Sequence, residues 1–118
     1  MPVKAYSSSS ILTRVDPTMF SALAEPNRLR IVELLRERPS SVNHIAAQLN
    51  LRQPQTSKHL QVLSRARLVT VRPVAQQRIY VLRPEAFMQL DAWLGSFERH
   101  WKNRLSKLDS YLEHLKER

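Results

Sequence analysis

The sequence predicts a mainly α-helical fold with a small β-hairpin and a long C-terminal helix. Apolar residues recur at helical spacing along most of the 118 residues, and prolines stand where several helices are expected to begin. Two short runs rich in β-branched residues, 69–74 and 78–82, indicate the hairpin. These segments divide the chain into a flexible N-terminal arm over 1–14, a compact domain over 15–83 and the C-terminal helix over 84–118.

The first two helices are marked by their starting residues. Asp16 followed by Pro17 predicts the first helix, because aspartate caps free N–H groups and proline suits the first helical turn. Pro26 predicts the start of the second helix, and Pro39 predicts its end. The inward side of the second helix is expected to carry the apolar residues that repeat at helical spacing, Leu29, Ile31, Val32, Leu34 and Leu35.

Two further short helices follow, with a short connection between them. Ser40 or Ser41 can cap the third helix, whose inward residues are expected to be Val42, Ile45, Ala46 and Leu49. Asn50 suits the left-handed conformation that ends a helix, and Pro54 suits the first turn of a fourth helix. The connection of about four residues that ends at Gln53 is typical of a helix-turn-helix. With the hairpin after it, this order predicts a winged helix-turn-helix domain.

Most of the polar residues of the fourth helix are expected on the side away from the core. Leu60 and Leu63 are expected to face inward, with Thr56 and His59 on the same side, so we interpret His59 as packed rather than catalytic or metal-binding. The exposed residues carry amide, hydroxyl and ammonium groups. These groups can hydrogen-bond to base edges in the major groove of DNA or to phosphate. We therefore expect base contacts from Gln53, Gln55, Ser57, Lys58 and Gln61.

The positive charge of the chain is concentrated in its middle segment. The formal net charge is +9, and residues 28–83 contain eleven Lys and Arg but only two Glu, whereas residues 1–27 and 84–118 are each balanced. A localised basic segment favours a polyanionic partner, which we take to be duplex DNA. In the hairpin, Arg72 and Arg78 are expected to contact the DNA backbone or the minor groove. The alternative is a winged-helix interaction module that binds an acidic protein through the same surface.

An apolar stripe at near-heptad spacing runs along the C-terminal segment. One small domain cannot cover so long a stripe, so we expect a second copy of the chain to pack against it. Membrane-surface binding is less favoured, because residues 84–118 carry six acidic and six basic side chains. The homodimer is expected to present two recognition helices to a near-palindromic DNA site. The expected interface residues are Met19, Phe20, Leu23, Leu94, Phe97, Trp101, Leu105, Leu108 and Leu112.

Four stretches of the sequence resemble the ArsR/SmtB-type winged-helix repressors. They are FSALAEPNRLRIVELL (20–35), IAAQLNLRQPQTSKHLQVL (45–63), LVTVRP (68–73) and RIYVLRPEAF (78–87). The resemblance implies a homodimeric DNA-binding repressor that an effector releases. It also places Arg78 on the wing, and on the DNA-contact helix it places Gln53, Gln55, Ser57 and Lys58.

The sequence departs from this family at both ends of the first wing strand. The family usually has Gly between the recognition helix and that strand, where this chain has Arg67. A positive φ there is expected to cost Arg67 about 1 kcal/mol. The wing tip, Ala75-Gln76-Gln77, also lacks Gly, so the sequence does not define its turn type.

The composition argues against several kinds of site. The absence of Cys excludes thiolate metal ligands, and the single Gly argues against a phosphate-binding loop. His114 and Glu117 match half of a C-terminal metal site of the resembling family, but Trp101 and Asn103 stand where the other ligands are needed. We therefore expect no metal and no cofactor, and keep a metal-responsive repressor as an alternative.

Other classes of protein are also disfavoured. No paired carboxylates, nucleophile motif or complete metal cluster is present, so an enzyme is not expected. No apolar segment has the length of a membrane span or signal peptide, which favours a cytoplasmic protein with no membrane partner. The implied effector is an unidentified small molecule.

Overall fold

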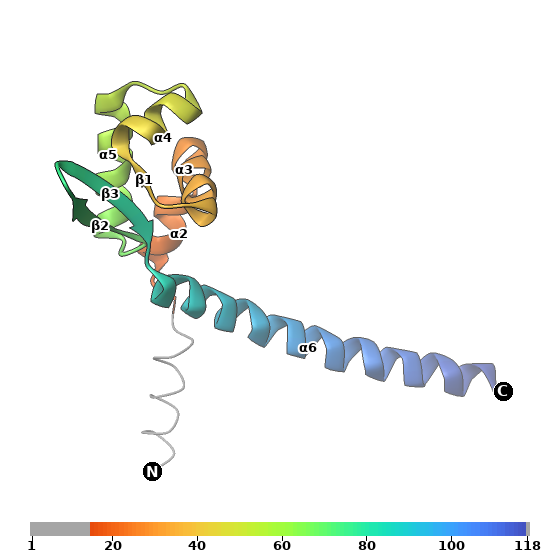
Figure 1. Cartoon of the computed structure of the whole chain (residues 1–118). Coiled ribbons are helices and arrows are strands. Elements are labelled where there is room, and N and C mark those ends of the chain that lie inside the picture. The colour runs from red at the N-terminus through yellow and green to blue at the C-terminus, as the bar shows by residue number, and fades with distance from the viewer. Residues whose placement is uncertain (1–14, 118) are drawn as a thin grey trace, which may run out of the picture. The chain divides into compact units, whose positions relative to one another are not determined.

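A computed structural model describes residues 15–117, so the arm expected over residues 1–14 lies outside the described residues. The described chain divides into two units (Figure 1). The first is the compact domain Val15–Phe87, and the second is the part of the C-terminal helix that follows it from Met88. We describe each unit by itself.

Four helices form most of the domain: α2 (Pro17–Leu23), α3 (Pro26–Glu37), α4 (Val42–Leu49) and α5 (Gln53–Arg65). Their starts agree with the capping residues in the sequence. The Asp16 carboxylate accepts a hydrogen bond from the Thr18 N–H at 2.9 Å, and the Ser41 hydroxyl accepts one from the His44 N–H at 3.1 Å. Glu25, which the sequence did not single out, caps α3 by accepting from the Arg28 N–H at 2.9 Å.

A three-stranded antiparallel sheet completes the domain, in the order β1-β3-β2. The strands β2 (Val69–Val74) and β3 (Gln77–Leu82) form the predicted hairpin. Its turn is one residue shorter than expected, because Gln77 pairs with Val74. The strand β1 (Ser40–Ser41) was not expected from the sequence, and it pairs with the middle of β3.

The core of the domain lies between the helices and the inner face of the sheet. Its fully buried side chains come from α3, α4, α5, β2 and the residue before β2; they are Ile31, Ile45, Thr56, Leu60, Leu63, Leu68 and Val69. Leu29 differs from the expectation, because it is 45% exposed on the side of α3 away from this core. The sequence pattern therefore overstated the width of the inward face of α3.

Among residues 15–117, three non-glycine residues have left-handed backbone conformations. Asn50 has φ 56° and ends α4, as predicted. Arg67 has φ 62°, which confirms the strain expected where the resembling family has Gly. There the Arg67 N–H donates to Ser64 O and the Leu68 N–H donates to Leu63 O, both at 3.0 Å. Ala75 has φ 55° in the turn between β2 and β3, so both ends of β2 are strained.

The long helix α6 (Pro84–Lys116) has 33 residues and begins at the predicted proline. Its apolar stripe is exposed in the single chain: six predicted interface residues have exposed fractions between 46% and 58%, namely Leu94, Phe97, Trp101, Leu105, Leu108 and Leu112. Aromatic rings add to this surface, since the Trp93 and Phe97 rings are 4.8 Å apart. Within residues 15–117, no helix is long and apolar enough to span a membrane.

Candidate nucleic-acid interface

The helices α4 and α5 form the helix-turn-helix unit. Their connection comprises three residues, from Asn50 to Arg52, one fewer than the sequence suggested. The Leu51 N–H donates to Ala46 O at 2.9 Å, and the Thr56 hydroxyl donates to Arg52 O at 2.9 Å. The first bond closes the end of α4, and the second lies within the first turn of α5, so local hydrogen bonds define both ends of the connection.

The predicted base-reading residues lie on the accessible part of α5. The side chains of Gln53, Gln55, Lys58 and Gln61 are exposed, and Ser57 is half-buried. Within residues 15–117, none of these five side chains makes a hydrogen bond or ion pair with another part of the chain. Their donors and acceptors are therefore available to an external ligand. The opposite side of α5 packs inward through Thr56, Leu60 and Leu63, as expected.

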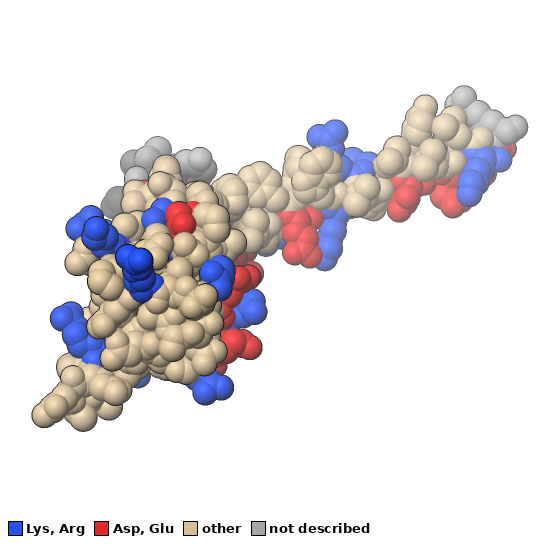
Figure 2. Space-filling model, turned by 90° about the horizontal axis from the view of Figure 1, so that it is seen from above, with Lys and Arg blue, Asp and Glu red and all other residues tan. Residues whose placement is uncertain are grey.

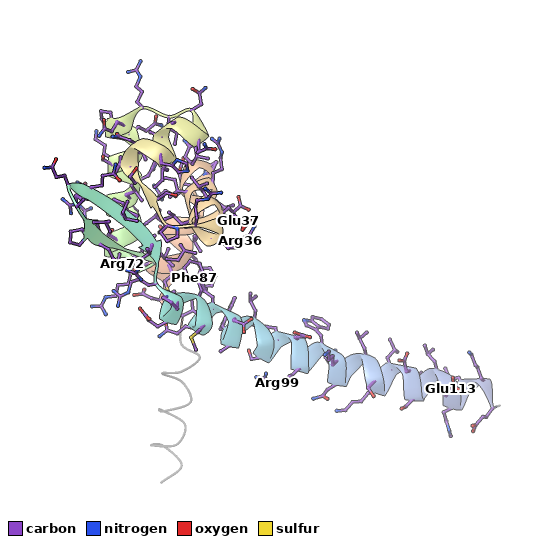
Figure 3. The ribbon with its side chains drawn as sticks, in the orientation of Figure 1. Arg36, Glu37, Arg72, Phe87, Arg99 and Glu113 are labelled. Carbon is purple, nitrogen blue, oxygen red and sulfur yellow. The ribbon has the colours of Figure 1, made fainter. Side chains whose placement is uncertain are left out.

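Some of the basic residues of the domain have structural roles. The Arg28 guanidinium donates to Ala22 O at 2.6 Å, and the Arg30 guanidinium donates to Leu49 O at 3.2 Å. Arg36 and Arg83 form ion pairs with Glu37 and Glu85. Figure 3 shows Arg36 and Glu37 together at one end of α3.

The remaining basic residues supply positive charge to the domain surface. Within the described residues, seven of the eleven basic side chains over 28–83 have no ion-pair or hydrogen-bond partner: Arg38, Arg52, Lys58, Arg65, Arg67, Arg72 and Arg78. Figure 2 shows Lys and Arg side chains spread over one face of the domain. Such charge attracts a polyanion and leaves these cations free to contact phosphate.

The wing, formed by β2 and β3, brings further polar groups beside the start of α5. A cleft of about 210 Å³ is lined by residues 41–43 at the start of α4, by Gln53 and by residues 76–78 at the wing tip. Gln53 and Arg78 of the predicted site thus share one cleft. Arg72, labelled in Figure 3, lies on β2 and is exposed.

Sequence reasoning missed three polar residues of this cleft: Asn43, Gln76 and Gln77. The sequence shows these residues, but it does not show the contact that brings them together. Two serines are too short a run to predict a strand, and the pairing of β1 with β3, Ser40 with Tyr80 and Ser41 with Ile79, carries the wing tip to the start of α4. The cleft therefore depends on a tertiary contact that no local pattern reveals.

His59 of α5 lies beside Glu25, which caps the start of α3. Its side chain is 14% exposed, and its Nδ1 lies 3.7 Å from Oε2 of Glu25. The packed position agrees with the prediction, but Nε2 is buried with no hydrogen-bond partner among the described residues. Partial burial raises the pKa of Glu25, but the N–H groups of Arg28 and Asn27 and the adjacent His59 lower it by more. The net pKa of Glu25 therefore lies below its usual value.

The expected dimer residues of α2 differ in their accessibility. Phe20 is 41% exposed and Leu23 is half-buried, so both retain some surface for a partner. Met19 corrects the prediction: it is 4% exposed in the single chain, because α2 packs against α3 and α5 and turns this side chain into the core. Met19 therefore belongs to the core of its own chain rather than to an interface.

No group of three or more His, Asp or Glu side chains within residues 15–117 has an arrangement that could hold a metal ion. His114 and Glu117 both lie in the last turns of the described chain and are exposed.

The fold and its polar helix define the class of protein: a winged helix-turn-helix domain. A family model described as a helix-turn-helix domain matches residues 23–72. The HTH-type transcriptional regulator Rv2034 of Mycobacterium tuberculosis is 38% identical over 87 residues, which cover 74% of this chain and 78% of the relative. The transcriptional repressor SdpR of Bacillus subtilis is 26% identical over 74% of this chain and 97% of its own.

A solved structure agrees with these relatives. It is the homodimeric winged helix-turn-helix DNA-binding domain of Mb0332 from Mycobacterium bovis, a possible ArsR-family transcriptional regulator. The two structures have a TM-score of 0.60 and 25% identity, over 85% of this chain and 89% of that chain. The chain belongs to the ArsR/SmtB-type family of DNA-binding winged helix-turn-helix transcriptional regulators, as its sequence resemblance predicted.

Proposed function

We propose that this chain is a homodimeric repressor that binds a near-palindromic DNA site through α5 and the wing. One observation carries the proposal: the outer face of α5 presents five polar side chains that have no partner within residues 15–117. A polar face used only for solubility has no need of the basic surroundings found here. The name of SdpR supports repression, and the homodimeric Mb0332 domain supports two copies.

The residues have different roles in this proposal. Gln53, Gln55, Ser57 and Gln61 read base edges, and Lys58 contacts guanine or phosphate. Arg72 and Arg78 contact phosphates beside the wing. Phosphate contacts release counterions and so depend strongly on salt, whereas base contacts determine the preferred sequence. The two kinds of residue can therefore be separated by experiment.

The test is a gel-shift series over salt concentration. It compares binding to the preferred DNA site, the operator, with binding to random duplex DNA. Gln53→Ala should weaken operator binding about tenfold and leave binding to random DNA nearly unchanged. Arg78→Ala should weaken binding to both DNAs by similar factors and reduce the slope of log K against log salt by about one unit. Equal losses for both variants on both DNAs would contradict base reading by α5.

A matched control is available on the same domain. Gln48 on α4 is an exposed amide outside the cleft, so Gln48→Ala should leave both affinities unchanged. Retention on random duplex DNA at low salt also distinguishes the proposal from an interaction module for acidic proteins. Absence of any DNA binding at low salt would favour that alternative.

The dimer contacts in this proposal come from the α6 stripe and, separately, from Phe20 and Leu23 of α2. The stripe carries large apolar side chains that are about half-exposed in one chain. Continuous apolar surface of this kind on a small protein marks an interaction site. A stable monomer in sedimentation that binds one isolated half-site with full affinity would refute the dimer.

A further inference from the structure

Two arginines of α3 donate hydrogen bonds to the last carbonyl groups of the neighbouring helices. The Arg28 guanidinium donates to Ala22 O at 2.6 Å, near the end of α2, and the Arg30 guanidinium donates to Leu49 O at 3.2 Å, at the end of α4. The last carbonyls of a helix have no partner within it, and this end attracts positive charge. Because the last turns of α2 and α4 contain no basic residue of their own, α3 supplies the cation for both.

The bond from Arg30 is made where the connection of the helix-turn-helix begins. N–H groups of the connection itself donate to the carbonyls of Ala46 and Ala47. The last carbonyl of α4, that of Leu49, accepts instead from Arg30, which lies 19 residues earlier in the chain. A second guanidinium nitrogen of Arg30 donates to the Asn27 side chain at 3.2 Å, which orients the planar group. The helix α3 thus holds the connection by a directional contact as well as by apolar packing.

Arg28 and Arg30 together connect the two surfaces of the proposed function. The helix α2 carries Phe20 and Leu23, which are proposed to contact a second copy of the chain, whereas α4 and α5 form the helix-turn-helix. The apolar contacts of α3 with these helices are non-directional, but hydrogen bonds from a guanidinium have a defined geometry. The two arginines therefore restrict the rotation of α2 and α4 against α3.

We infer that Arg28 and Arg30 are positioning residues that set the spacing between the two half-sites accepted by the dimer, without contacting DNA themselves. The inference rests on the proposed function and adds two specificity residues to it. Adding or removing one base pair between the half-sites moves them by about 3.4 Å along the duplex and turns them by about 35°. A domain whose helices are fixed against one another cannot follow this change, whereas a looser domain can.

Operators with one base pair added to or removed from the spacer test this role. Wild type should bind them about tenfold more weakly than it binds the operator. In Arg28→Gln and in Arg30→Gln this loss should shrink to about threefold, because the released helices can rotate toward the displaced half-sites. Affinity for one isolated half-site should change by less than about twofold, since the polar face of α5 is kept.

The salt dependence of binding separates positioning from phosphate contact. A phosphate contact by Arg30 would make Arg30→Gln reduce the slope of log K against log salt by about one unit. In the positioning role, the slope should remain that of wild type. Arg30→Lys keeps the charge but loses the planar pair of donors, so it should weaken the spacing preference as Arg30→Gln does.

The matched control is Arg36→Gln. It removes the same charge from the same helix, but Arg36 is exposed and pairs with Glu37 of α3 itself, so the tenfold spacing preference should remain. Thermal melting checks that each variant is folded at the assay temperature. A domain that is only destabilised would lose affinity for every DNA by the same factor and keep its spacing preference.

The outcomes separate this inference from the proposed function. An unchanged spacing preference in the variants of Arg28 and Arg30, or a slope reduced by one unit in Arg30→Gln, would overturn the inference while leaving base reading by α5 intact. A weakened spacing preference in Arg36→Gln as well would assign the effect to net charge and would also overturn it. Equal affinity of the wild type for every spacing and for one half-site would refute the proposed dimer itself.

Discussion

Arg67 and Ala75 each hold a conformation that glycine adopts at no steric cost. A left-handed φ costs a residue with a Cβ atom on the order of 1 kcal/mol, and glycine's greater freedom in the unfolded chain offsets part of the gain from replacing it. Arg67→Gly should therefore raise the free energy of unfolding by about 0.5 kcal/mol. Chemical denaturation at fixed protein concentration measures this change.

Arg65→Gly is the matched control, since it removes the same side chain from the last residue of α5, two positions earlier. Glycine destabilises a helix relative to an ordinary residue, so this variant should lower the free energy of unfolding by about 0.5–1 kcal/mol. If both variants change the free energy of unfolding in the same direction, loss of the arginine side chain, and not the backbone conformation, causes the effect.

Glu25 predicts a pH-dependent contribution to stability. Its pKa is lowered in the folded chain, mainly because N–H donation by Arg28 and Asn27 outweighs the opposing effect of burial. A carboxyl of this kind stabilises the fold above its unfolded pKa, and the contribution is lost as pH falls through the lower folded pKa. Glu25→Gln should lower the free energy of unfolding by about 0.5 kcal/mol at neutral pH. This difference should close as pH falls from the unfolded pKa of a glutamate through the lower folded pKa of Glu25.

The control for this pH series is Glu33→Gln, an exposed glutamate on the same helix that caps nothing. Denaturation curves between neutral and acidic pH should be the same for Glu33→Gln and wild type. A constant gap between Glu25→Gln and wild type at every pH would mean that ionisation of Glu25 plays no part.

At the scale of elements, α6 gives the clearest prediction. Leu105→Lys with Leu112→Lys places two charges in the apolar stripe, where each leucine is about half-exposed in one chain. If the proposed dimer buries both leucines, their loss should raise the dimer dissociation constant at least about a hundredfold. Sedimentation velocity over a concentration series measures this shift.

Asn103→Lys with Ser110→Lys adds the same charges at the same spacing on the other side of α6, by the helical period. This control pair should leave the dimer intact. Dissociation by both pairs would mean that added charge, rather than loss of the stripe, separates the chains. No change with either pair would exclude α6 from the interface.

The sequence predicted the helices well because their signals are local. Asp16, Ser41 and the prolines at 17, 26 and 84 mark helix starts through bonds or torsions within one turn. It could not predict β1, whose two serines form a strand only because β3 lies beside them. Glu25 and His59 likewise approach each other from segments far apart in sequence.

At the scale of the whole molecule, the proposed dimer predicts a dependence on half-site spacing. Two recognition helices related by a two-fold axis reach successive major grooves about 34 Å apart. Inserting about five base pairs between the half-sites turns them to opposite faces of the duplex, so affinity should fall to that of one half-site. Replacing the same spacer bases without changing their number should have little effect.

The candidate site was predictable in part. The exposed polar face of α5, which we propose reads bases, followed from helical periodicity, and its basic surroundings from the charge excess of residues 28–83; both are local properties of the chain. Met19 was assigned to the wrong surface, since a pattern of apolar residues does not say which neighbour they pack against. For the same reason the cleft that joins Asn43 to the wing tip was not foreseen.

The half-exposed stripe of α6 also bears on how steeply such a regulator responds to its own abundance. If only paired chains occupy the operator, the concentration of active species rises with the square of the chain concentration while most chains are single. A twofold change in synthesis then changes the dimer about fourfold. A threshold in gene expression can thus arise from one apolar helix face, before any effector takes part.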